Sequence, residues 1–591
     1  MPNFLSKSKY LNGLQCPRLI WIQIHEPGRI PEADPVTQHV FDQGHVVGEL
    51  AKKLFPEGID LSQETFMGNI SKTKDLLKAR VPLFEPGIRS GNIYSRLDII
   101  SPAGWGPGVG DRGLGTGERD WDIYEVKAST SVKDVHIDDV AFQRYCCIQA
   151  GLHIDKCRLV LINNEYVKKG KIDPKGFFTI HDITAEVAAA SAGIQDRIDG
   201  IMEVIGRETC PEMIIGPHCK EPYECALTDC WDCLPEHSVF SLYHSGKKAF
   251  ELYNKGIVSI AEIADGYKLN NQQSIQKACV ISGQPHVDKK AIREFLAELK
   301  YPLYYFDFET IAPVVPLFDG TRPYQNVPFQ YSLHVVRDEF SGPEHHSFLA
   351  TEAGDPRPAL LSSLRSVIGD TGTVLAYNKG FEEGILQEMA TAFPEHSGWI
   401  EKVCDRLVDL LVPFRAFAYY HPAQKGSASL KAVMPAITGK GYGDMDIADG
   451  QKASILYLGA VYGDKPNNQD TRYSDSLTSC GTPLRRRNNQ IMTNNQIKIT
   501  KLDSGLRQND KKNTGDRDKV MSDLEEYCGR DTEGMIWIVE RLRELGGNNQ
   551  ETRDSDSPNS YGTPLRRRKK QTMTNNQTQD YQTGFWTTIK I

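Results

Sequence analysis

The sequence has no apolar run near the roughly 20 residues that a membrane-spanning helix requires. Its first residues, MPNFLSKSKYLNGLQCPRL, also lack the apolar stretch and the small-residue cleavage site of a secretory signal. These two absences speak against an integral membrane protein and against an exported one. We therefore expect a cytoplasmic protein with no membrane partner.

Charge of one sign is not in large excess either, since the net charge of the 591 residues is -8 with 25% charged residues. A mildly acidic chain can still bind nucleic acid, because phosphate contacts need only a local basic lining. The apolar share of 39% supplies material for two or three cores, so a multidomain α/β (α+β) protein is expected. Thirteen cysteines in a cytosolic chain do not suggest a disulfide framework.

The chain divides into three segments and a tail. Residues 1–235 combine helical patterns with the strand-like runs NIYSRLDII, DIYEVKA and CRLVLIN. Residues 236–297 read as a helical linker, although the turn KGI leaves a helix-hairpin-helix as an alternative. Residues 298–545 begin with strands and end with helices, which predicts a mixed sheet covered by helices. Residues 546–591 are predicted to be a disordered tail.

One internal repeat interrupts this order, because residues 467–496 recur with most positions identical as residues 548–577. Both copies are polar and nearly free of large apolar residues, so neither can build a core. We expect the first copy to lie in a disordered insert spanning 467–517. The alternative is a pair of basic arms at 485–487 and 566–570 that contact DNA phosphates.

Several acidic residues of the third segment occupy positions that suit a metal site. Asp307 and Glu309 lie two apart on a predicted strand, so both side chains project from one face and repel each other unless a cation lies between them. Glu382 follows another strand at the start of a helix. Tyr527 and Asp531 are four residues apart on a helix and therefore share a face.

The arrangement resembles the DEDD superfamily of 3′–5′ exonucleases, which has a DnaQ-like, ribonuclease H-related fold. The first motif, Asp-x-Glu, is matched by Asp307 and Glu309. The second, an Asn followed by Phe-Asp, is matched by Asn378 and Phe381, with Glu382 where Asp is usual. The third, Tyr-x-x-x-Asp, marks the tyrosine subtype.

The third motif is matched by Tyr527 and Asp531. The resemblance implies a two-metal mechanism in which Mg²⁺ or Mn²⁺ is held by four carboxylates: Asp307, Glu309, Glu382 and Asp531. It also implies that Tyr527 orients the attacking water and that Asn378 contacts the nucleic acid. Because Glu382 is one methylene longer than Asp, either the metal position shifts or Glu383 serves instead. A role on a helix surface is expected for the nearby Asp409.

A second acidic pattern lies in the first segment. Glu125 and Lys127 share one face of a predicted strand, and Asp98 lies in the run NIYSRLDII, which predicts the neighbouring strand. Such a trio can bind a divalent cation while the lysine steadies a phosphate or the attacking water. The alternative is a surface strand with an ordinary Glu/Lys pair.

This pattern resembles PD-(D/E)XK nucleases of the RecB type, including the CRISPR-associated and AddB-like branches, which have a restriction-endonuclease-like fold. The resemblance implies that Asp98, Glu125 and Lys127 are catalytic. It also implies that His45 completes a metal site and that Gln143, on the following helix, contacts DNA.

The same branches carry a [4Fe–4S] cluster held by one early cysteine and three late ones. The matching residues are Cys16, Cys219, Cys225 and Cys230, with Cys233 as a substitute. The rival interpretation is a structural zinc on the four closely spaced cysteines of 219–233, which would leave Cys16 unexplained.

The whole order resembles an uncharacterised bacterial family that fuses a RecB-like, cysteine-cluster domain to a DEDD exonuclease. The resemblance implies a metal-dependent DNA exonuclease that acts on single strands or ends, in repair or in defence against foreign DNA. Two alternatives stay open. One is a non-catalytic nucleic-acid-binding protein with decayed nuclease sites, and the other is an RNA-processing exonuclease.

Overall fold

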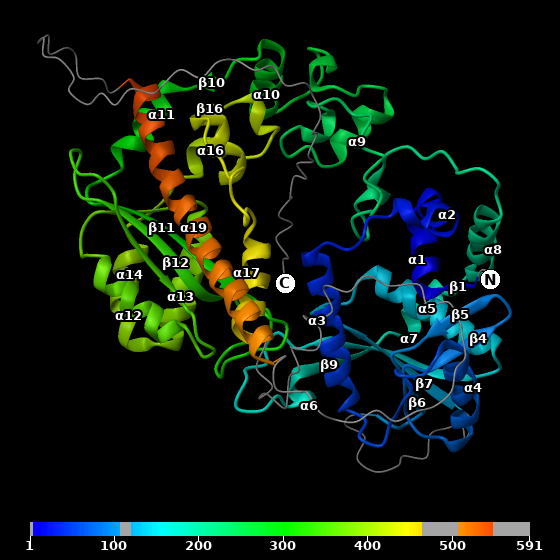
Figure 1. Cartoon of the computed structure of the whole chain (residues 1–591). Coiled ribbons are helices and arrows are strands. Elements are labelled where there is room, and N and C mark those ends of the chain that lie inside the picture. Colours follow the sequence, from blue (N-terminus) through cyan, green and yellow to red (C-terminus); the bar gives the residue numbers. More distant parts are fainter. Residues whose placement is uncertain (1–3, 107–119, 464–505, 548–591) are drawn as a thin grey trace, which may run out of the picture.

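The computed structural model describes residues 4–106, 120–463 and 506–547, and it is a mixed α/β protein of two halves that lie side by side (Figure 1). Both copies of the repeat, and the two basic arms within them, lie outside the described residues. None of the described helices combines the length and the apolar character required of a membrane span.

The N-terminal half contains a six-stranded sheet and a three-stranded sheet. The larger sheet has the order β2 (Ile59–Asp60), β3 (Leu83–Phe84), β6 (Ile99–Pro102), β7 (Asp120–Lys127), β8 (His153–Ile162) and β9 (Phe178–Asp182). The smaller has the order β1 (Leu5–Ser6), β5 (Ile93–Arg96) and β4 (Gly87–Ser90). The helices are α1 (Lys7–Gln15), α2 (Pro17–His25), α3 (Pro35–Lys52), α4 (Phe66–Leu76), α5 (Asp134–Gln149), α6 (Pro174–Phe177), α7 (Thr184–Ala190) and α8 (Ile194–Ile205).

Strands β7 and β8 form a parallel pair at the centre of this half. Parallel strands are covered on both faces, which is why their sequences are nearly continuous apolar runs. Helix α5 covers one face, where Phe142 packs with Ile123 and Leu159. Helix α3 covers the other face, where Val47 and Tyr124 share a core cluster. The end of β7 that carries Glu125 and Lys127 is therefore held firmly in the sheet.

The segment between the halves is helical, with α9 (Lys247–Asn254), α10 (Asn271–Ser282) and α11 (Lys289–Ala297). Gly256, at φ +78°, follows the end of α9, and a 3₁₀ turn at Ile260–Glu262 comes next. The KGI turn thus does not join two α-helices directly. Strand β10 (His286–Val287) pairs with β16 (Tyr419–Tyr420), and α11 packs against α19 (Leu506–Gly546), so the end of this segment belongs to the C-terminal half.

The C-terminal half is built on a five-stranded mixed sheet in the order β13 (Glu344–Leu349), β12 (Val327–Val336), β11 (Leu303–Ile311), β14 (Thr373–Ala376) and β15 (Leu407–Asp409). Strands β11, β12 and β13 are antiparallel, whereas β14 and β15 run parallel to β11.

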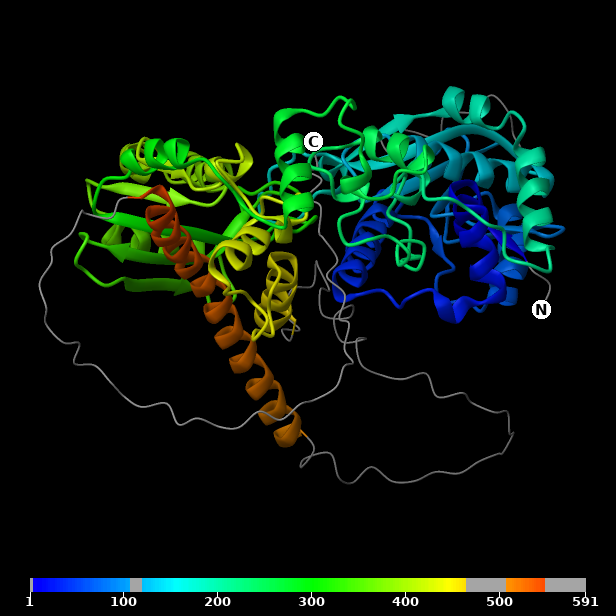
Figure 2. The same cartoon turned by 90° about the horizontal axis from the view of Figure 1, so that it is seen from above.

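Helices α12 (Arg357–Val367), α13 (Lys379–Ala392) and α14 (Ser397–Cys404) cover one face of this sheet. The other face carries α11, α16 (Leu430–Thr438) and α19. Figure 2 shows α19 running diagonally past the strands. Helix α17 (Gly450–Tyr462) packs beside α19, and α15 (Val412–Arg415) follows β15.

Strand β11 shows how the sequence positions the acidic residues. Tyr304, Phe306 and Phe308 point into the core beneath α12 to α14. The alternate positions, among them Tyr305, point toward α19, and Asp307 and Glu309 share that face because the side-chain period of a strand is two. Burial of each aromatic side chain stabilises the strand by roughly 1.5–3 kcal/mol. A β-bulge follows directly between Glu309 and Thr310, a device that re-aims side chains next to active sites.

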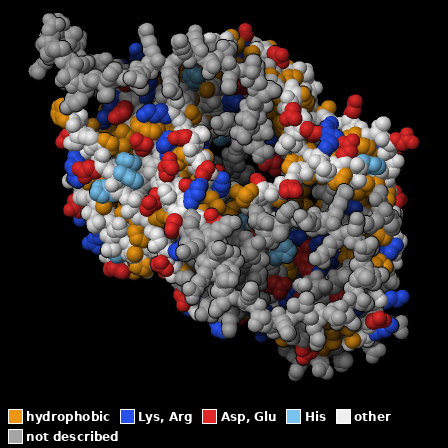
Figure 3. Space-filling model, viewed as in Figure 1, with side chains coloured by type: hydrophobic (Ala, Val, Ile, Leu, Met, Phe, Trp, Pro, Cys, Tyr) orange, Lys and Arg blue, Asp and Glu red, His pale blue; other side chains and the backbone are white. Residues whose placement is uncertain are grey.

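The two halves contact each other through the segment that follows β11. Val314 and Val315 are buried in the apolar cluster of the N-terminal half, next to Phe177 and Phe178 among others. The Lys168 ammonium lies 2.6 Å from the Asp319 carboxylate. Helix α3 also packs against α17. On the face drawn in Figure 3, basic and acidic side chains are interspersed.

Candidate active site and cysteine cluster

Four acidic side chains from three distant segments meet beside strand β11. Asp307 and Glu309 belong to β11 itself, and Asp531 is on α19, which packs against β11 and β12. Glu382 is in the first turn of α13. Strand β14 pairs with residues 303–305 of β11, so the later part of β11 has no strand partner on that side. There the Phe308 N–H donates a hydrogen bond to the Glu382 carboxylate.

Glu309, Glu382 and Asp531 are buried, Asp307 is half-buried, and the four carboxylates repel one another. Burial, followed by the charge of Asp531, raises the pKa of Asp307 well above its usual range. Burial and the charges of Asp307 and Asp531 do the same to Glu309, while burial and Asp307 raise the pKa of Glu382. Burial raises the pKa of Asp531 to about 6, although hydrogen bonds and Lys431 oppose this. Such a cluster requires protons or cations for neutralisation.

The donor set fits a divalent cation. Glu382 is 2% exposed, and its Oε2 atom has no hydrogen-bond partner in the described part of the chain. Ligand atoms of Asp307, Glu309 and Cys528 all lie within 4.8 Å of one another. Asp531 and Glu382 are outside that compact trio, but their electrostatic coupling to Asp307 places them in the same centre. Carboxylate oxygens in this number favour Mg²⁺ or Mn²⁺.

Residues outside the sequence motifs complete the centre. The Tyr442 hydroxyl donates to Oδ1 of Asp531. The Lys431 ammonium lies 5.2 Å from the centre of the Tyr527 ring, and its charge lowers the pKa of Asp307 and Asp531. Tyr442 lies in a loop and Lys431 lies in the first turn of α16, so their spacing in the sequence does not identify them as residues of this centre.

Tyr527 lies within the centre, as the third motif predicts. Its side chain is buried, and burial together with the carboxylate of Asp531 raises its pKa well above the usual range, so the phenol remains a proton donor. The N-terminus of α17 faces the same point: a Cβ atom on Gly450 would lie 3.6 Å from Oε2 of Glu309 and 3.8 Å from the Tyr527 hydroxyl. A helix N-terminus favours negative charge nearby.

The residues around the second motif are divided between the centre and its rim. Glu382 faces the carboxylates, whereas Glu383 lies 3.9 Å from Lys379 in an ion pair. Asn378 is exposed at φ +76°, and Phe381 is 37% exposed. The helix-surface role predicted for Asp409 is wrong, because Asp409 ends strand β15 and accepts hydrogen bonds from the Asn378 and Leu411 N–H groups.

The raised carboxyl pKa values predict pH-dependent metal binding. A metal ion must displace protons from these groups, so we expect affinity for Mn²⁺ to fall by at least about tenfold between pH 7.5 and pH 5. The sign follows from Asp531, whose pKa of about 6 lies above its usual value and leaves it protonated at pH 5. Titration calorimetry at a series of pH values measures the effect. The Asp531→Asn variant should show a flatter pH profile, and an unchanged slope would contradict this assignment.

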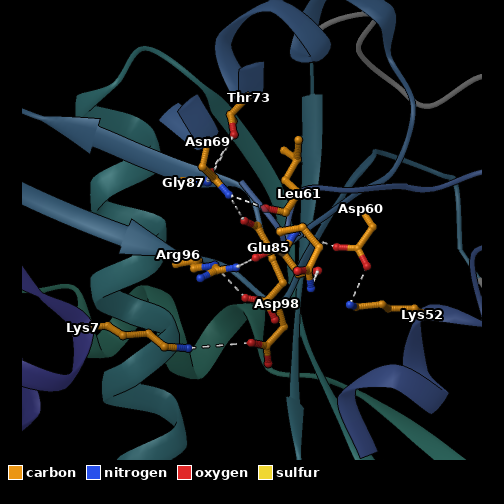
Figure 4. Close-up of polar contacts among 12 residues, drawn as sticks. Lys7, Lys52, Asp60, Leu61, Asn69, Thr73, Glu85, Gly87, Arg96 and Asp98 are labelled. Carbon is orange, nitrogen blue, oxygen red and sulfur yellow. Dashed lines mark hydrogen bonds and ion pairs between the residues drawn. The ribbon is translucent and has the colours of Figure 1, made fainter. Parts of the chain in front are cut away.

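The predicted acidic residues of the N-terminal half also meet, but two lysines lie among them. Glu125 Oε1 lies 2.6 Å from the Lys127 ammonium and 2.8 Å from the Lys7 ammonium. Lys127 also lies 2.7 Å from Asp139, and Lys7 reaches toward Asp98 at 3.9 Å (Figure 4). Burial alone would lower the pKa of both lysines, but the charges of Glu125, Asp139 and Asp98 raise it instead. The lysines are therefore charged and partly neutralise this centre.

The other two predicted residues of this centre occupy different positions. Gln143 is fully buried, and its amide donates to Glu125 at 2.8 Å and to Asp139 at 3.0 Å, so it orients the acids. His45 is exposed on α3 and, within the described ranges, makes no hydrogen bond or ion pair with these acids. Sequence reasoning missed Asp139, although its i, i+4 spacing from Gln143 was a usable signal. Lys7 lies far from these residues in the sequence, and no pattern in the sequence pointed to it.

Four cysteines line one small pocket between the start and the end of the N-terminal half. They are Cys16, Cys219, Cys225 and Cys230. Cys16 directly precedes α2. Two hydrogen bonds join the segment around residues 207–218 to α1 and α2: the Gln15 side chain donates to the His218 carbonyl at 2.9 Å, and the Trp21 side chain donates to the Arg207 carbonyl at 3.0 Å. Cys233 is exposed and does not line the pocket.

The spacing of these sulfur atoms bears on the group they can hold. In a tetrahedral zinc site with Zn–S bonds of about 2.3 Å, the sulfur atoms lie roughly 3.8 Å apart. Among the described residues of the N-terminal half, no three of the cysteine sulfurs lie within 4.8 Å of one another. Four thiolates can hold either a zinc ion or a [4Fe–4S] cluster.

Two similarities to known proteins can be set against this geometry. Residues 304–429 match a family model described as "Domain of unknown function (DUF2779)". The match begins within β11 and ends just before α16, so it includes Asp307, Glu309 and Glu382 but not Asp531. A protein of Mycoplasma pneumoniae with the name "Uncharacterized protein MG366 homolog" is 28% identical over 167 residues, which is 25% of this chain and 25% of that relative. The chain thus spans about a quarter of the length of this relative.

Proposed function

We propose that this chain is a metal-dependent nuclease that removes nucleotides from DNA ends or single strands in the 3′–5′ direction. The observation that carries the proposal is the meeting of Asp307, Glu309, Glu382 and Asp531 in one buried centre. A protein does not keep four mutually repelling carboxylates, three of them buried and one half-buried, together for stability, because they oppose folding when no cation is bound. The five-stranded mixed sheet beneath them supports assignment of a ribonuclease H-like DEDD domain of the tyrosine subtype.

Bound divalent ions would supply activation of water and neutralisation of the charge on the phosphate. The residues of this chain prepare the centre for those ions. Tyr442 donates to Asp531 and fixes its orientation. Tyr527 presents a protonated hydroxyl beside Asp531 and Glu309, where it can orient a water molecule. Lys431 contributes a positive charge that opposes the build-up of negative charge on phosphate.

The rim of the centre offers contacts for a nucleotide. Phe381 is partly exposed one residue before Glu382, and an exposed aromatic ring can stack on a base of any sequence. Asn378 is exposed at the start of the same helix and can donate to the sugar or phosphate. These contacts suit an enzyme that acts on ends without strong sequence preference.

For the N-terminal half we propose a RecB-like domain of the PD-(D/E)XK type that binds or cuts DNA. Asp98, Glu125 and Lys127 gather at one end of β6 and β7, as such a site requires. The four pocket cysteines fit a [4Fe–4S] cluster, which would supply a covalent clamp between the first and last parts of this half. A role in DNA repair or in defence against foreign DNA is part of the same proposal.

The test is degradation of end-labelled oligonucleotides by the full-length protein. A single-stranded DNA labelled at its 5′ end, incubated with Mn²⁺ or Mg²⁺, should yield a ladder of products shortened from the 3′ end. A chelator should abolish the ladder, and fresh Mn²⁺ should restore it. Matched RNA strands run in parallel decide the substrate class. Preference for RNA would overturn the choice of DNA, and no degradation of either polymer would overturn the nuclease.

A further inference from the structure

A cysteine thiol lies inside the carboxylate centre. Cys528 is on α19 between Tyr527 and Asp531, and it is completely buried. Its Sγ atom donates to Oδ2 of Asp307 at 3.8 Å. Together with a carboxylate oxygen of Glu309, these atoms form a set in which all lie within 4.8 Å of one another. A two-metal carboxylate centre does not need sulfur, so the thiol requires its own explanation.

The size of the set fits a different class of cation from Mg²⁺. Zinc binds thiolate sulfur at about 2.3 Å and carboxylate oxygen at about 2.0–2.2 Å, which places neighbouring ligand atoms roughly 3.5 Å apart. The Cys528 and Asp307 ligand atoms, 3.8 Å apart, are close to that spacing, and the Glu309 oxygen lies within 4.8 Å of both. Soft thiolate ligands select Zn²⁺, whereas carboxylate and water ligands suit Mg²⁺ and Mn²⁺.

A third carboxylate, outside the compact trio, interacts with two of its members. Oε2 of Glu382 is buried without a hydrogen-bond partner among the described residues, and Glu382 couples electrostatically to both Asp307 and Glu309. With Glu382 the set would comprise three carboxylates and one thiol, which matches the four-coordinate preference of zinc.

We propose that Cys528, Asp307 and Glu309 form a mixed thiolate–carboxylate site that binds Zn²⁺ in place of the catalytic ions and so inhibits the nuclease. The inhibitory part rests on the proposed function, whereas the binding part does not. On binding, the thiol gives its proton to solvent and its sulfur bonds to the ion. Mg²⁺ and Mn²⁺ prefer carboxylate and water oxygen to sulfur, so the same centre distinguishes two classes of cation.

Co²⁺ serves as the probe of binding, because a thiolate bound to Co²⁺ gives a charge-transfer absorption band in the near ultraviolet. The full-length protein is titrated with Co²⁺ and compared with Cys528→Ser, with Asp307→Asn and with the matched control Cys404→Ser. Cys404 is a half-buried cysteine at the end of α14. The band contributed by this site should be present in the wild type and in the control. It should be lost both in Cys528→Ser and in Asp307→Asn, which retains the thiol.

Inhibition is measured separately, as the Zn²⁺ concentration that halves the Mn²⁺-supported activity of each variant relative to its own activity without Zn²⁺. We expect this concentration to rise at least tenfold in Cys528→Ser and to stay unchanged in Cys404→Ser. A Co²⁺ band that persists undiminished in Cys528→Ser would overturn the site. A band that behaves as expected in a protein without nuclease activity would uphold the site and defeat only the proposed function.

Discussion

Replacement of Asp307 by Asn is expected to reduce metal-dependent DNA degradation by at least about a thousandfold. Asp307 interacts electrostatically with each of the other three carboxylates of the centre, those of Asp531, Glu309 and Glu382. Metal ions in such sites contribute several kcal/mol of transition-state stabilisation, and about 4 kcal/mol corresponds to about a thousandfold in rate. Initial rates on a 5′-labelled single strand at saturating Mn²⁺ measure the loss.

The matched control is Glu125→Gln, which alters the acidic centre of the N-terminal half by the same carboxylate-to-amide change. If the C-terminal centre is the exonuclease, the ladder of shortened products persists in Glu125→Gln and disappears in Asp307→Asn. The reverse pattern would transfer the activity to the N-terminal half. Asp307→Asn should also melt at a higher temperature than the wild type without metal, because one of four repelling carboxylates is gone. The thermal shift produced by Mn²⁺ should shrink at the same time.

Replacement of Cys16 by Ser is expected to have the largest effect on stability. Cys16 precedes α2, whereas the other three pocket cysteines lie about 200 residues later, beginning with Cys219. A cluster held across this interval contributes its binding free energy to folding of the N-terminal half. Cys16→Ser should therefore lose most of the bound iron and the brown colour, and the melting temperature should fall by about 5–10 °C. Iron analysis and differential scanning fluorimetry of anaerobically purified protein measure both.

Cys233→Ser is the control for this substitution, because Cys233 is exposed and outside the pocket. It should retain iron and melt as the wild type does. Loss of the metal in Cys233→Ser together with its retention in Cys16→Ser would favour the rival site on the four late cysteines. A colourless wild-type protein containing one equivalent of zinc would defeat the iron–sulfur assignment altogether.

Local patterns in the sequence were sufficient to predict the strand and the helix that carry most of the C-terminal acidic residues. The aromatic run around Asp307 and Glu309 predicts a buried strand, and the two-residue spacing predicts that both acids share its face. The four-residue spacing of Tyr527 and Asp531 likewise predicts one face of a helix. These predictions depend on neighbours in the sequence, and the structure has β11 and α19 at these positions.

The remaining residues of both centres depend on contacts between distant segments. Tyr442 lies in a loop with no periodicity, and its hydrogen bond to Asp531 exists only once α19 has docked on the sheet. Lys7, which is more than 100 residues before Glu125 in the sequence, forms an ion pair with it. Asp409 was expected on a helix because RLVDLL is compatible with either element, and pairing with β14 decides for a strand. Tertiary contact, which leaves no local trace, decides each of these cases.

The burial of Val314 and Val315 in the N-terminal half affects any attempt to express the two halves separately. They follow strand β11 by only a few residues, yet they are buried among side chains of the N-terminal half. A fragment cut near residue 298 would present both valines to water and would release the tether that holds the downstream end of β11. Removal of the first half is thus expected to loosen the end of β11 that carries Asp307 and Glu309.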